Sequence, residues 1–276
     1  MRHGIYRGIT MTVAGSDSGG GAGIQADLKT FAALKVFGTS AITAVTIQNS
    51  LGVTGFHCVP PEVITAQILA VGKDFPVDAV KTGMLGSRAA VAAAAEAFSE
   101  LGVTKLVVDP VMVAQSGDSL LADEAVEAVR NIIVPMALIV TPNLPEAEKL
   151  TGMKISDVED MTAAAHEIAK LGCRAVLVKG GHLSGEPDII TDVLLADGQL
   201  TLLQDRRIET AANHGTGCTL SSAIAAELAA GCGLFEAVTR ARKYLRAGLS
   251  HGVTAGHGAG CLGHAVVMPW IESTNG

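Results

Sequence analysis

The sequence predicts an α/β fold with a mostly parallel sheet and helices on both of its faces. Short apolar runs alternate with longer segments of helical periodicity, and the runs are almost uninterrupted, as in strands covered on both sides. Composition agrees, because 49% of the 276 residues are hydrophobic and only 3% are aromatic, which predicts a large aliphatic core. This length suits one α/β domain, so residues 1–276 are treated as a single domain.

The predicted strands of the parallel sheet occupy the first two thirds of the chain. They are residues 9–14, 39–46, 79–81, 106–108, 138–141 and 175–178. Strands separated by helices in this way pair in parallel through crossover connections. Beyond them, a small antiparallel edge is expected from three runs, with a turn at residues 196–199 between the first two. These runs are residues 191–195, 200–203 and 207–209.

Two of the intervening helices carry clear start signals. Apolar residues recur at spacings of four, three and four from Ile64 to Phe75, behind Pro60 and Pro61 as a start signal, which favours an amphipathic helix. The segment Ser156-Asp157-Val158-Glu159 is a capping-box candidate at the start of another helix. The tail, about residues 252–276, is rich in Gly and His up to residue 263, and that part is expected to form a loop.

Charge and cysteine usage exclude several classes of function. The formal net charge of −7 argues against binding nucleic acid or an anionic membrane. Neither a membrane-spanning stretch of about 20 apolar residues nor a signal peptide is expected. The five cysteines form no CxxC pair, which fits a reducing cytoplasm better than a disulfide framework.

The glycine-rich loop at residues 15–23 follows the first strand and precedes a helix that contains Asp27. Ligands in open α/β sheets bind at the carboxyl ends of strands, and glycines allow close approach of the backbone, so a ligand loop is favoured over a merely flexible one. It is not a Walker A loop, because no GK[ST] follows. Only a loosened dinucleotide pattern fits, and residues 36–61 contain no acidic residue to hold a ribose, so dinucleotide binding is weakly supported.

A second segment, His214-Gly215-Thr216-Gly217-Cys218-Thr219, ends where a strongly predicted helix begins. The unpaired backbone N–H groups and the positive end of the helix dipole would form an anion hole there. The same field is expected to lower the pKa of the Cys218 thiol below about 8.5, which makes Cys218 a candidate base. A buried structural cysteine is the alternative for Cys218, and we favour that alternative for the other four.

Polar residues also follow two later strands. A Glu three residues after an Asn, Asn143 and Glu146, could hold hydrated Mg²⁺, and Lys179 could meet a polyphosphate as a point charge. The alternatives are an ordinary helix start for the Asn–Glu pair and a solvated lysine. Together with the two glycine-rich segments, at strand ends of one sheet, they favour phosphoryl transfer.

Two regions stay open. His251, His257 and His264 suggest a metal, but no acidic partner lies nearby, so His257 and His264 are predicted to be loop residues rather than ligands. The stretch at residues 52–58 could be a flap over a substrate.

Seven segments in this order resemble one known family: AGSDSGGGAGIQADLKT, AVTIQNS, DAVKTGML, VVDPVM, TPNLPEAEKL, VKGGH and HGTGCTLSSAIAAELA. They are similar to the hydroxymethylpyrimidine/phosphomethylpyrimidine kinases of thiamin biosynthesis, within the ribokinase-like superfamily, over roughly residues 9–250. The resemblance implies a ribokinase-like sheet of about eight strands, dependence on ATP and Mg²⁺, and a homodimer.

The resemblance also assigns roles to residues. Gln48 would bind the aminopyrimidine edge of the substrate, Asp27 and the backbone of Gly15 would line the same pocket, and Met84 and Val111 would pack on the ring. Asn143, Glu146 and Lys179 would lie on the nucleotide and metal side, with Glu146 acting through water. Gly215, Thr216 and Gly217 would supply the anion hole. Cys218 stands where most sugar kinases of the superfamily have an aspartate base, as in the pyrimidine-kinase branch.

The expected activity is therefore ATP-dependent phosphorylation of 4-amino-5-hydroxymethyl-2-methylpyrimidine and then of its monophosphate. A pyridoxal kinase of the same branch is the nearest alternative, since its substrate is also a hydroxymethylated aromatic ring. A non-catalytic ligand-binding protein on the same fold is a second alternative, against which Cys218, Lys179 and the GTG segment argue.

Overall fold

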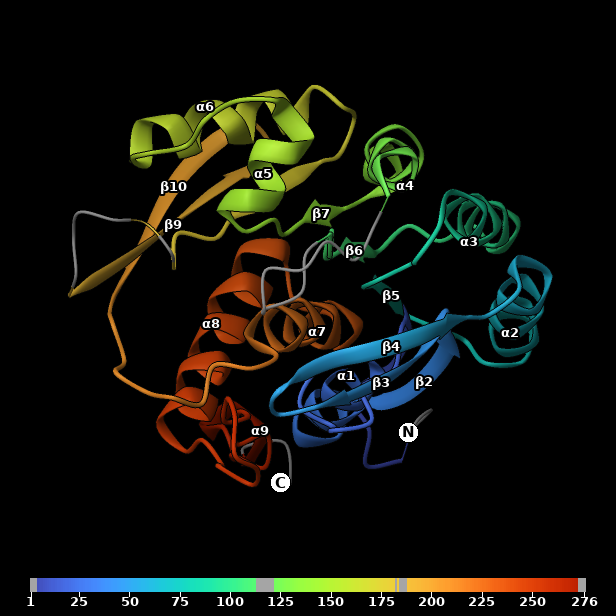
Figure 1. Ribbon diagram of the computed structural model, residues 1–276, viewed down its shortest axis with the longest axis horizontal. Coiled ribbons are helices and arrows are strands. Elements are labelled where there is room, and N and C mark those ends of the chain that lie inside the picture. Colours follow the sequence, from blue (N-terminus) through green and yellow to red (C-terminus); the bar gives the residue numbers. More distant parts are fainter. Residues whose placement is uncertain (1–3, 113–121, 182, 184–187, 273–276) are drawn as a thin grey trace.

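A computed structural model describes residues 4–112, 122–181, 183 and 188–272. Within these residues, eight strands form one sheet in the order β10-β9-β8-β7-β6-β5-β1-β2 (Figure 1). The strands are β1 (Ile9–Ala14), β2 (Phe37–Ile42), β5 (Ala79–Thr82), β6 (Leu106–Val108), β7 (Ile139–Val140), β8 (Ala175–Val178), β9 (Ile189–Ala196) and β10 (Gln199–Arg206). All neighbouring pairs from β2 to β8 are parallel, and β9 is antiparallel to both β8 and β10. The predicted fold class is confirmed.

The antiparallel edge is a hairpin whose turn has the residues that its geometry requires. Asp197 and Gly198 have φ values of 48° and 77°, the left-handed pair typical of a two-residue hairpin turn. The prediction of a third strand at residues 207–209 is wrong. Arg207 donates its N–H to the carbonyl of Asp188, one residue before β9 begins, so no partner strand remains beyond that point.

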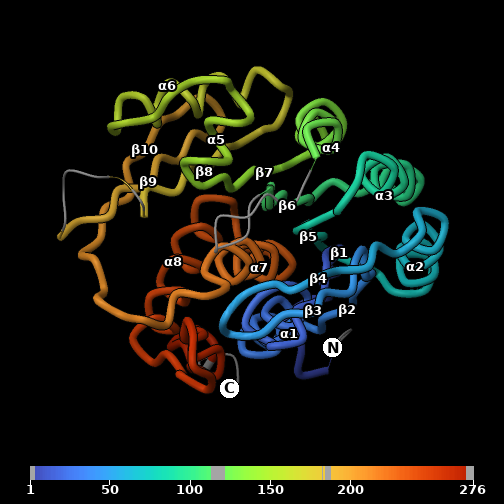
Figure 2. The backbone as a smooth tube through the Cα atoms, viewed as in Figure 1, coloured from blue at the N-terminus to red at the C-terminus, as the bar shows by residue number. Residues whose placement is uncertain are grey.

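The inner strands of the large sheet bury alternate residues on opposite faces, as period-two geometry requires. In β6, Leu106 and Val108 join one aliphatic core while Val107 joins the other. The first core is covered by α2 (Pro61–Asp74), α3 (Arg88–Leu101), α4 (Asp123–Ala128), α5 (Leu144–Thr151) and α6 (Val158–Ala169), with a π turn (Val129–Ile133) and a 3₁₀ turn (Val134–Met136) after α4. The second is covered by α1 (Gly23–Ala33), α7 (Thr216–Ala229), α8 (Leu234–Ser250) and α9 (Pro269–Glu272). Figures 1 and 2 show the two groups of helices on opposite sides of the curved sheet.

The predicted strand at residues 39–46 is in fact parts of two strands in different sheets. At Thr43 the backbone N–H reaches the carbonyl of Ala14 and the hydroxyl reaches the carbonyl of Met84, and pairing with β1 ends. The chain then enters β3 (Ala44–Asn49), which pairs with β4 (Gly52–Cys58) in a separate antiparallel hairpin. The apolar run continues through the break, so its pattern did not reveal the change of partner.

One helix start lies a residue away from its predicted cap. The N-cap of α6 is Asp157, not Ser156, and its side chain accepts the N–H of Asp160. Ser156 instead donates its backbone N–H and its hydroxyl to the carboxylate of Asp160. The capping box is therefore not reciprocal, because the carboxylate of Asp160 accepts from the residue before the N-cap and not from the N-cap itself.

The described part of the tail crosses the end of the β3–β4 hairpin. Gly258 donates its N–H to the hydroxyl of Ser50, and Ala259 donates to the Ser50 carbonyl. Figure 2 shows the tip of the hairpin beside this carboxyl-terminal segment. His264 is buried, its Nε2 lies 2.9 Å from Oγ1 of Thr219, and burial, with a smaller contribution from Lys29, lowers its pKa to about 4.

No helix in the described part of the chain combines the length and apolar character needed to cross a bilayer.

Candidate active site

The carboxyl ends of the parallel strands open into a cavity of about 720 Å³ that also reaches the start of α7 and the β3–β4 hairpin. Open α/β sheets bind their ligands at the carboxyl ends of the strands. The cavity is lined by eleven of the twelve residues that the sequence singled out. They are Gly15, Gln48, Met84, Val111, Asn143, Glu146, Lys179, Gly215, Thr216, Gly217 and Cys218.

The start of α7 faces this cavity because two glycine-rich loops pack closely. Gly215 is the N-cap, with a φ of 85°, and a Cβ there would lie 1.9 Å from the carbonyl oxygen of Gly21. Only glycine satisfies both conditions. The first-turn N–H groups, from Thr216 and Gly217 onward, have no carbonyl partner within the helix, so they are available to an anion.

Cys218 lies on the cavity wall in the first turn of α7, but its predicted acidity is wrong. Burial raises the pKa of its thiol to about 11, although the Lys81 ammonium and the Gly23 N–H lower it. The carboxylates of Asp27 and Asp109 raise it further. Desolvation and the two nearby negative charges together raise the pKa, so Cys218 is a thiol at neutral pH.

Asp27 does not line the cavity, contrary to the expectation from the family resemblance. Its side chain is 0% exposed and forms an ion pair with Lys81, also 0% exposed, with Nζ 3.0 and 2.9 Å from the two carboxylate oxygens. The hydroxyls of Thr12 and Ser222 donate to the same carboxylate at 2.6 and 2.5 Å. Because Ser222 is one turn after Cys218 on α7, this buried pair lies beneath the candidate base.

On the other side of the cavity a lysine lies between two carboxylates. Nζ of Lys179 is 3.1 Å from Oδ1 of Asp109 and 4.0 Å from Oε2 of Glu146. Burial lowers the pKa of Lys179, but the two carboxylates raise it more, so the ammonium stays charged. Asp109 follows β6 directly and lines the cavity, a position by which the sequence could have flagged it.

Asn143 and Glu146 form the capping box of α5, as the structural alternative expected. The Asn143 side chain accepts the N–H of Glu146, and the Glu146 carboxylate accepts the N–H of Asn143. Burial raises the pKa of Glu146 to about 7, Lys179 opposes this rise and Asp109 adds to it. A divalent cation would relieve the same repulsion, and two carboxylate groups beside the start of α7 suit Mg²⁺, which keeps most of its water.

The hairpin side of the cavity holds Gln48, whose terminal amide is bounded by two neighbours. It lies 3.3 Å from Nε2 of His214 and 3.2 Å from Oγ1 of Thr46. Cε of Met84 packs against Gly15, where an added Cβ would come within 2.9 Å of it. The cavity thus has a polar amide and an apolar methionine at the end far from Lys179.

Asp17 organises the glycine-rich loop and was not predicted as a site residue. Its carboxylate accepts the N–H groups of Gly19, Gly21 and Ala22, and His214 Nε2 lies 3.1 Å from Oδ2. Burial alone would raise the pKa of Asp17, but the bonds from His214, Ala22 and Gly19 hold it below 3.8. An Asp two residues before a glycine is a known turn signal, and that signal could have identified it.

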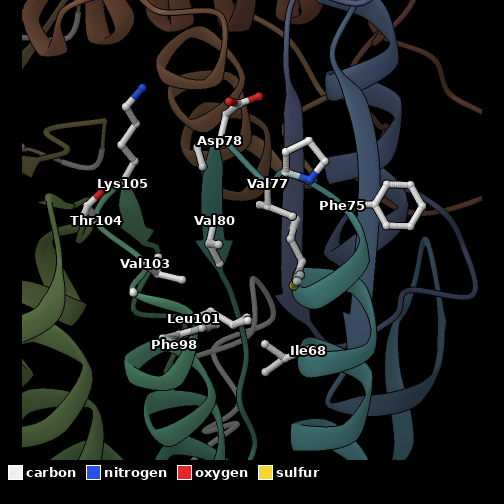
Figure 3. Close-up of a pocket in the computed structure, with 15 residues that line it drawn as sticks. Ile68, Phe75, Val77, Asp78, Val80, Phe98, Leu101, Val103, Thr104 and Lys105 are labelled. Carbon is white, nitrogen blue, oxygen red and sulfur yellow. The ribbon is translucent and has the colours of Figure 1, made fainter. Parts of the chain in front are cut away.

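A second pocket, of about 270 Å³, lies at the opposite edge of the sheet, between α2, α3 and the starts of β5 and β6 (Figure 3). Its apolar end is formed by Ile68, Phe98 and Leu101. Asp78 and Lys105 at the other end already bind the Ile9 N–H and the Leu228 carbonyl. None of the sequence-predicted site residues lines it.

Comparison with known proteins agrees with this geometry. The sequence profile described as phosphomethylpyrimidine kinase matches residues 17–263. A hydroxymethylpyrimidine/phosphomethylpyrimidine kinase of Rhizobium meliloti is 51% identical over 259 residues, covering 93% of this chain and 96% of that protein. A thiamine biosynthesis bifunctional protein of Geobacter sulfurreducens is 48% identical over 94% of this chain and 52% of its own length. The ADP complex of a Bacillus subtilis pyridoxal kinase superposes with a TM-score of 0.86 at 35% identity, covering 94% of this chain and 97% of that one.

Proposed function

This chain belongs to the phosphomethylpyrimidine kinase family, and from that premise we propose which residues carry out its reaction. The protein is a kinase of thiamin biosynthesis that phosphorylates 4-amino-5-hydroxymethyl-2-methylpyrimidine and then its monophosphate. ATP is the proposed phosphoryl donor, which the ADP complex of the similar pyridoxal kinase supports. One observation supports the residue assignment. A single cavity contains the start of α7, which can bind an anion, the cluster of Lys179 with two carboxylates, and the polar region around Gln48 that would bind the ring.

In the proposed arrangement, the N–H groups of the α7 start and Lys179 hold the phosphoryl group that is being transferred. Asp109 and Glu146 would hold Mg²⁺, Glu146 through water, and the ion would neutralise negative charge that builds up between donor and acceptor. The ring would lie between Gln48, Met84 and Val111 with its hydroxymethyl group toward α7. This aligns the alcohol with the phosphoryl group, which a loose transition state chiefly requires.

Cys218 is the proposed acceptor of the alcohol proton. Its thiol must first lose its own proton to the solvent, and the Lys81 ammonium and the Gly23 N–H are the groups that favour this loss. As the alcohol oxygen bonds to phosphorus, its proton passes to the Cys218 sulfur, and the bond from phosphorus to the leaving oxygen breaks.

Glu146 is expected to give Mg²⁺ binding a pH dependence. Because its pKa is about 7, the free enzyme must lose a proton from Glu146 to bind the ion below that pH. The apparent Mg²⁺ affinity should therefore rise up to roughly tenfold per pH unit toward pH 7 and level off above it. Titration calorimetry with Mg²⁺ and a non-hydrolysable ATP analogue at several pH values measures this.

Glu146→Gln is the matched control, since the amide keeps the shape but not the titration. In this variant the affinity should be weaker and almost independent of pH, and an unchanged pH profile would remove Glu146 from the ion site.

Glu146 affects the stability of the metal-free protein with the opposite pH dependence. Folding raises its pKa from 4.5 to about 7 and so favours the neutral carboxyl group. The stability that this group contributes is therefore complete below pH 4.5 and is lost as the pH rises through about 7.

The substrate is tested by steady-state kinetics with both candidate rings. We expect a higher kcat/KM for the aminopyrimidine than for pyridoxal, and the reverse order would make the chain a pyridoxal kinase of the same branch. Failure to consume ATP with either ring would instead support a non-catalytic binding protein.

A homodimer is also proposed, from the outer face of the β3–β4 hairpin. Val45 and Ile47 are two residues apart in β3, so their side chains lie on the same face of the strand, where they are 52% and 65% exposed. Leu51 at the tip of the hairpin is 71% exposed. Apolar side chains gathered on one strand face favour association. A single-chain mass in analytical ultracentrifugation at micromolar concentration would reject the dimer.

A cytoplasmic location is proposed as well, and the five free cysteines support it.

A further inference from the structure

We propose that His214 is a positioning residue that sets the orientation of the Gln48 amide, and that it thereby selects rings with a hydrogen-bond donor beside an acceptor. The proposal rests on the proposed function, because it takes Gln48 to meet the ring. His214 immediately precedes the GTG segment, so one loop would serve both ends of the substrate.

Asp17 determines which ring nitrogen of His214 carries a hydrogen. That carboxylate is 2% exposed and accepts three backbone N–H groups, from Gly19, Gly21 and Ala22, which keep it ionised. An ionised carboxylate only accepts hydrogen bonds. With Oδ2 at 3.1 Å, Nε2 of His214 must therefore carry a hydrogen, in the neutral ring and in the imidazolium alike.

This proton dictates which atom of Gln48 faces the histidine. The amide nitrogen stands toward His214 at 3.3 Å, which sets two N–H donors against each other. Exchanging the amide oxygen and nitrogen, which leaves every heavy-atom position in place, turns the contact into a hydrogen bond. Asp17 and Gln48 then share the His214 N–H.

Thr46 independently requires the same orientation. Its hydroxyl donates to the carbonyl of Ser16 at 2.8 Å, so toward Gln48, 3.2 Å away, it offers only a lone pair. The group opposite that lone pair must be the amide NH₂. Two neighbours from different segments thus select one orientation of Gln48, with oxygen toward His214 and nitrogen toward Thr46.

The remaining capacity of the amide is what a ring would meet. Once these two bonds are made, Gln48 keeps one oxygen lone pair and one N–H, and within the described residues no other protein group takes them. A 4-aminopyrimidine matches them, since its amino group donates to the oxygen and its ring nitrogen accepts the N–H. A 4-oxo ring with a protonated ring nitrogen has the reverse pattern and would need the amide turned against both His214 and Thr46.

The test compares binding of the aminopyrimidine and its 4-oxo analogue by calorimetry, alongside turnover of both. The preference is the dissociation constant of the 4-oxo analogue divided by that of the aminopyrimidine. His214→Leu removes the donor, and this ratio should fall about tenfold or more, with KM changing more than kcat. His214→Gln, whose terminal amide can place an N–H near the former Nε2, should keep most of the ratio. Thr46→Val should lower the ratio in the same direction, and thermal melting checks that each variant is folded.

Gln48→Ala separates the possible failures. If Gln48→Ala abolishes the preference but His214→Leu leaves it unchanged, the inference is overturned while the proposed function stands. If His214→Leu does not fold, an unchanged ratio in Thr46→Val overturns the inference instead. If the ratios shift as expected but no variant, nor the unaltered protein, phosphorylates the ring, the positioning role stands and the proposed function fails.

Discussion

Replacing Cys218 with alanine is expected to lower kcat by about 10² or more, the usual contribution of a general base. The alanine removes the atom that takes the alcohol proton, while the α7 start, Lys179 and the ring site remain. Steady-state kinetics with saturating aminopyrimidine and ATP measures the change. Unchanged turnover would remove Cys218 from the mechanism.

The control for this experiment is Cys58→Ala, which removes an exposed cysteine at the end of β4. Its turnover should stay close to that of the unaltered protein. The pH profile adds a second check. Because burial raises the pKa of Cys218 to about 11, the thiolate fraction grows with pH up to that value. The kcat of the unaltered protein should therefore rise between pH 7 and 9, and Cys218→Ala should lose this rise.

Replacing Lys81 with methionine is expected to lower the free energy of unfolding by about 3–5 kcal/mol. The change leaves the Asp27 carboxylate buried with two hydroxyl partners but no counter-charge. Urea unfolding at pH 7 measures the loss. Adding Asp27→Asn should recover a large part of it, since the buried site then carries no charge.

Lys73→Met is the matched control, because it breaks a lysine–glutamate pair on the surface. Lys73 and Glu100 are 60% and 52% exposed, and their contact should contribute well under about 1 kcal/mol. If Lys81→Met and Lys73→Met lowered the free energy of unfolding equally, loss of the buried pair would cost no more stability than loss of the surface pair. Lys81→Met should also raise the pKa of Cys218, since the ammonium is the main group that lowers it.

The arrangement of the candidate site at the strand ends was predictable, because it follows from local signals. Parallel strands end at one edge of a sheet, so segments that follow β1, β7 and β8 had to lie near one another. The helix start at Gly215 was visible as glycines before an apolar helical pattern. Asp109 follows β6 by the same rule and could have been included.

Other features depended on contacts between segments far apart in the chain. The break at Thr43 arises because Ala14 and Met84 take its hydrogen bonds, and no pattern within residues 39–49 records those partners. Likewise, Asp27 became a structural residue because Lys81 and Ser222, 54 and 195 positions away, meet it in the core.

The sequence by itself determined the α/β class, the strand and helix segments in outline, the glycine-rich loops and the presence of a thiol at the start of α7. Periodicity, capping and turn chemistry act within a few residues, so they can be recognised in the chain. Only the tertiary structure decided the ionisation of that thiol, the burial of Asp27 and the bonding of His214 to Asp17. Desolvation and charge pairing depend on which distant side chains are brought together, and no pattern within a few residues of the chain records them.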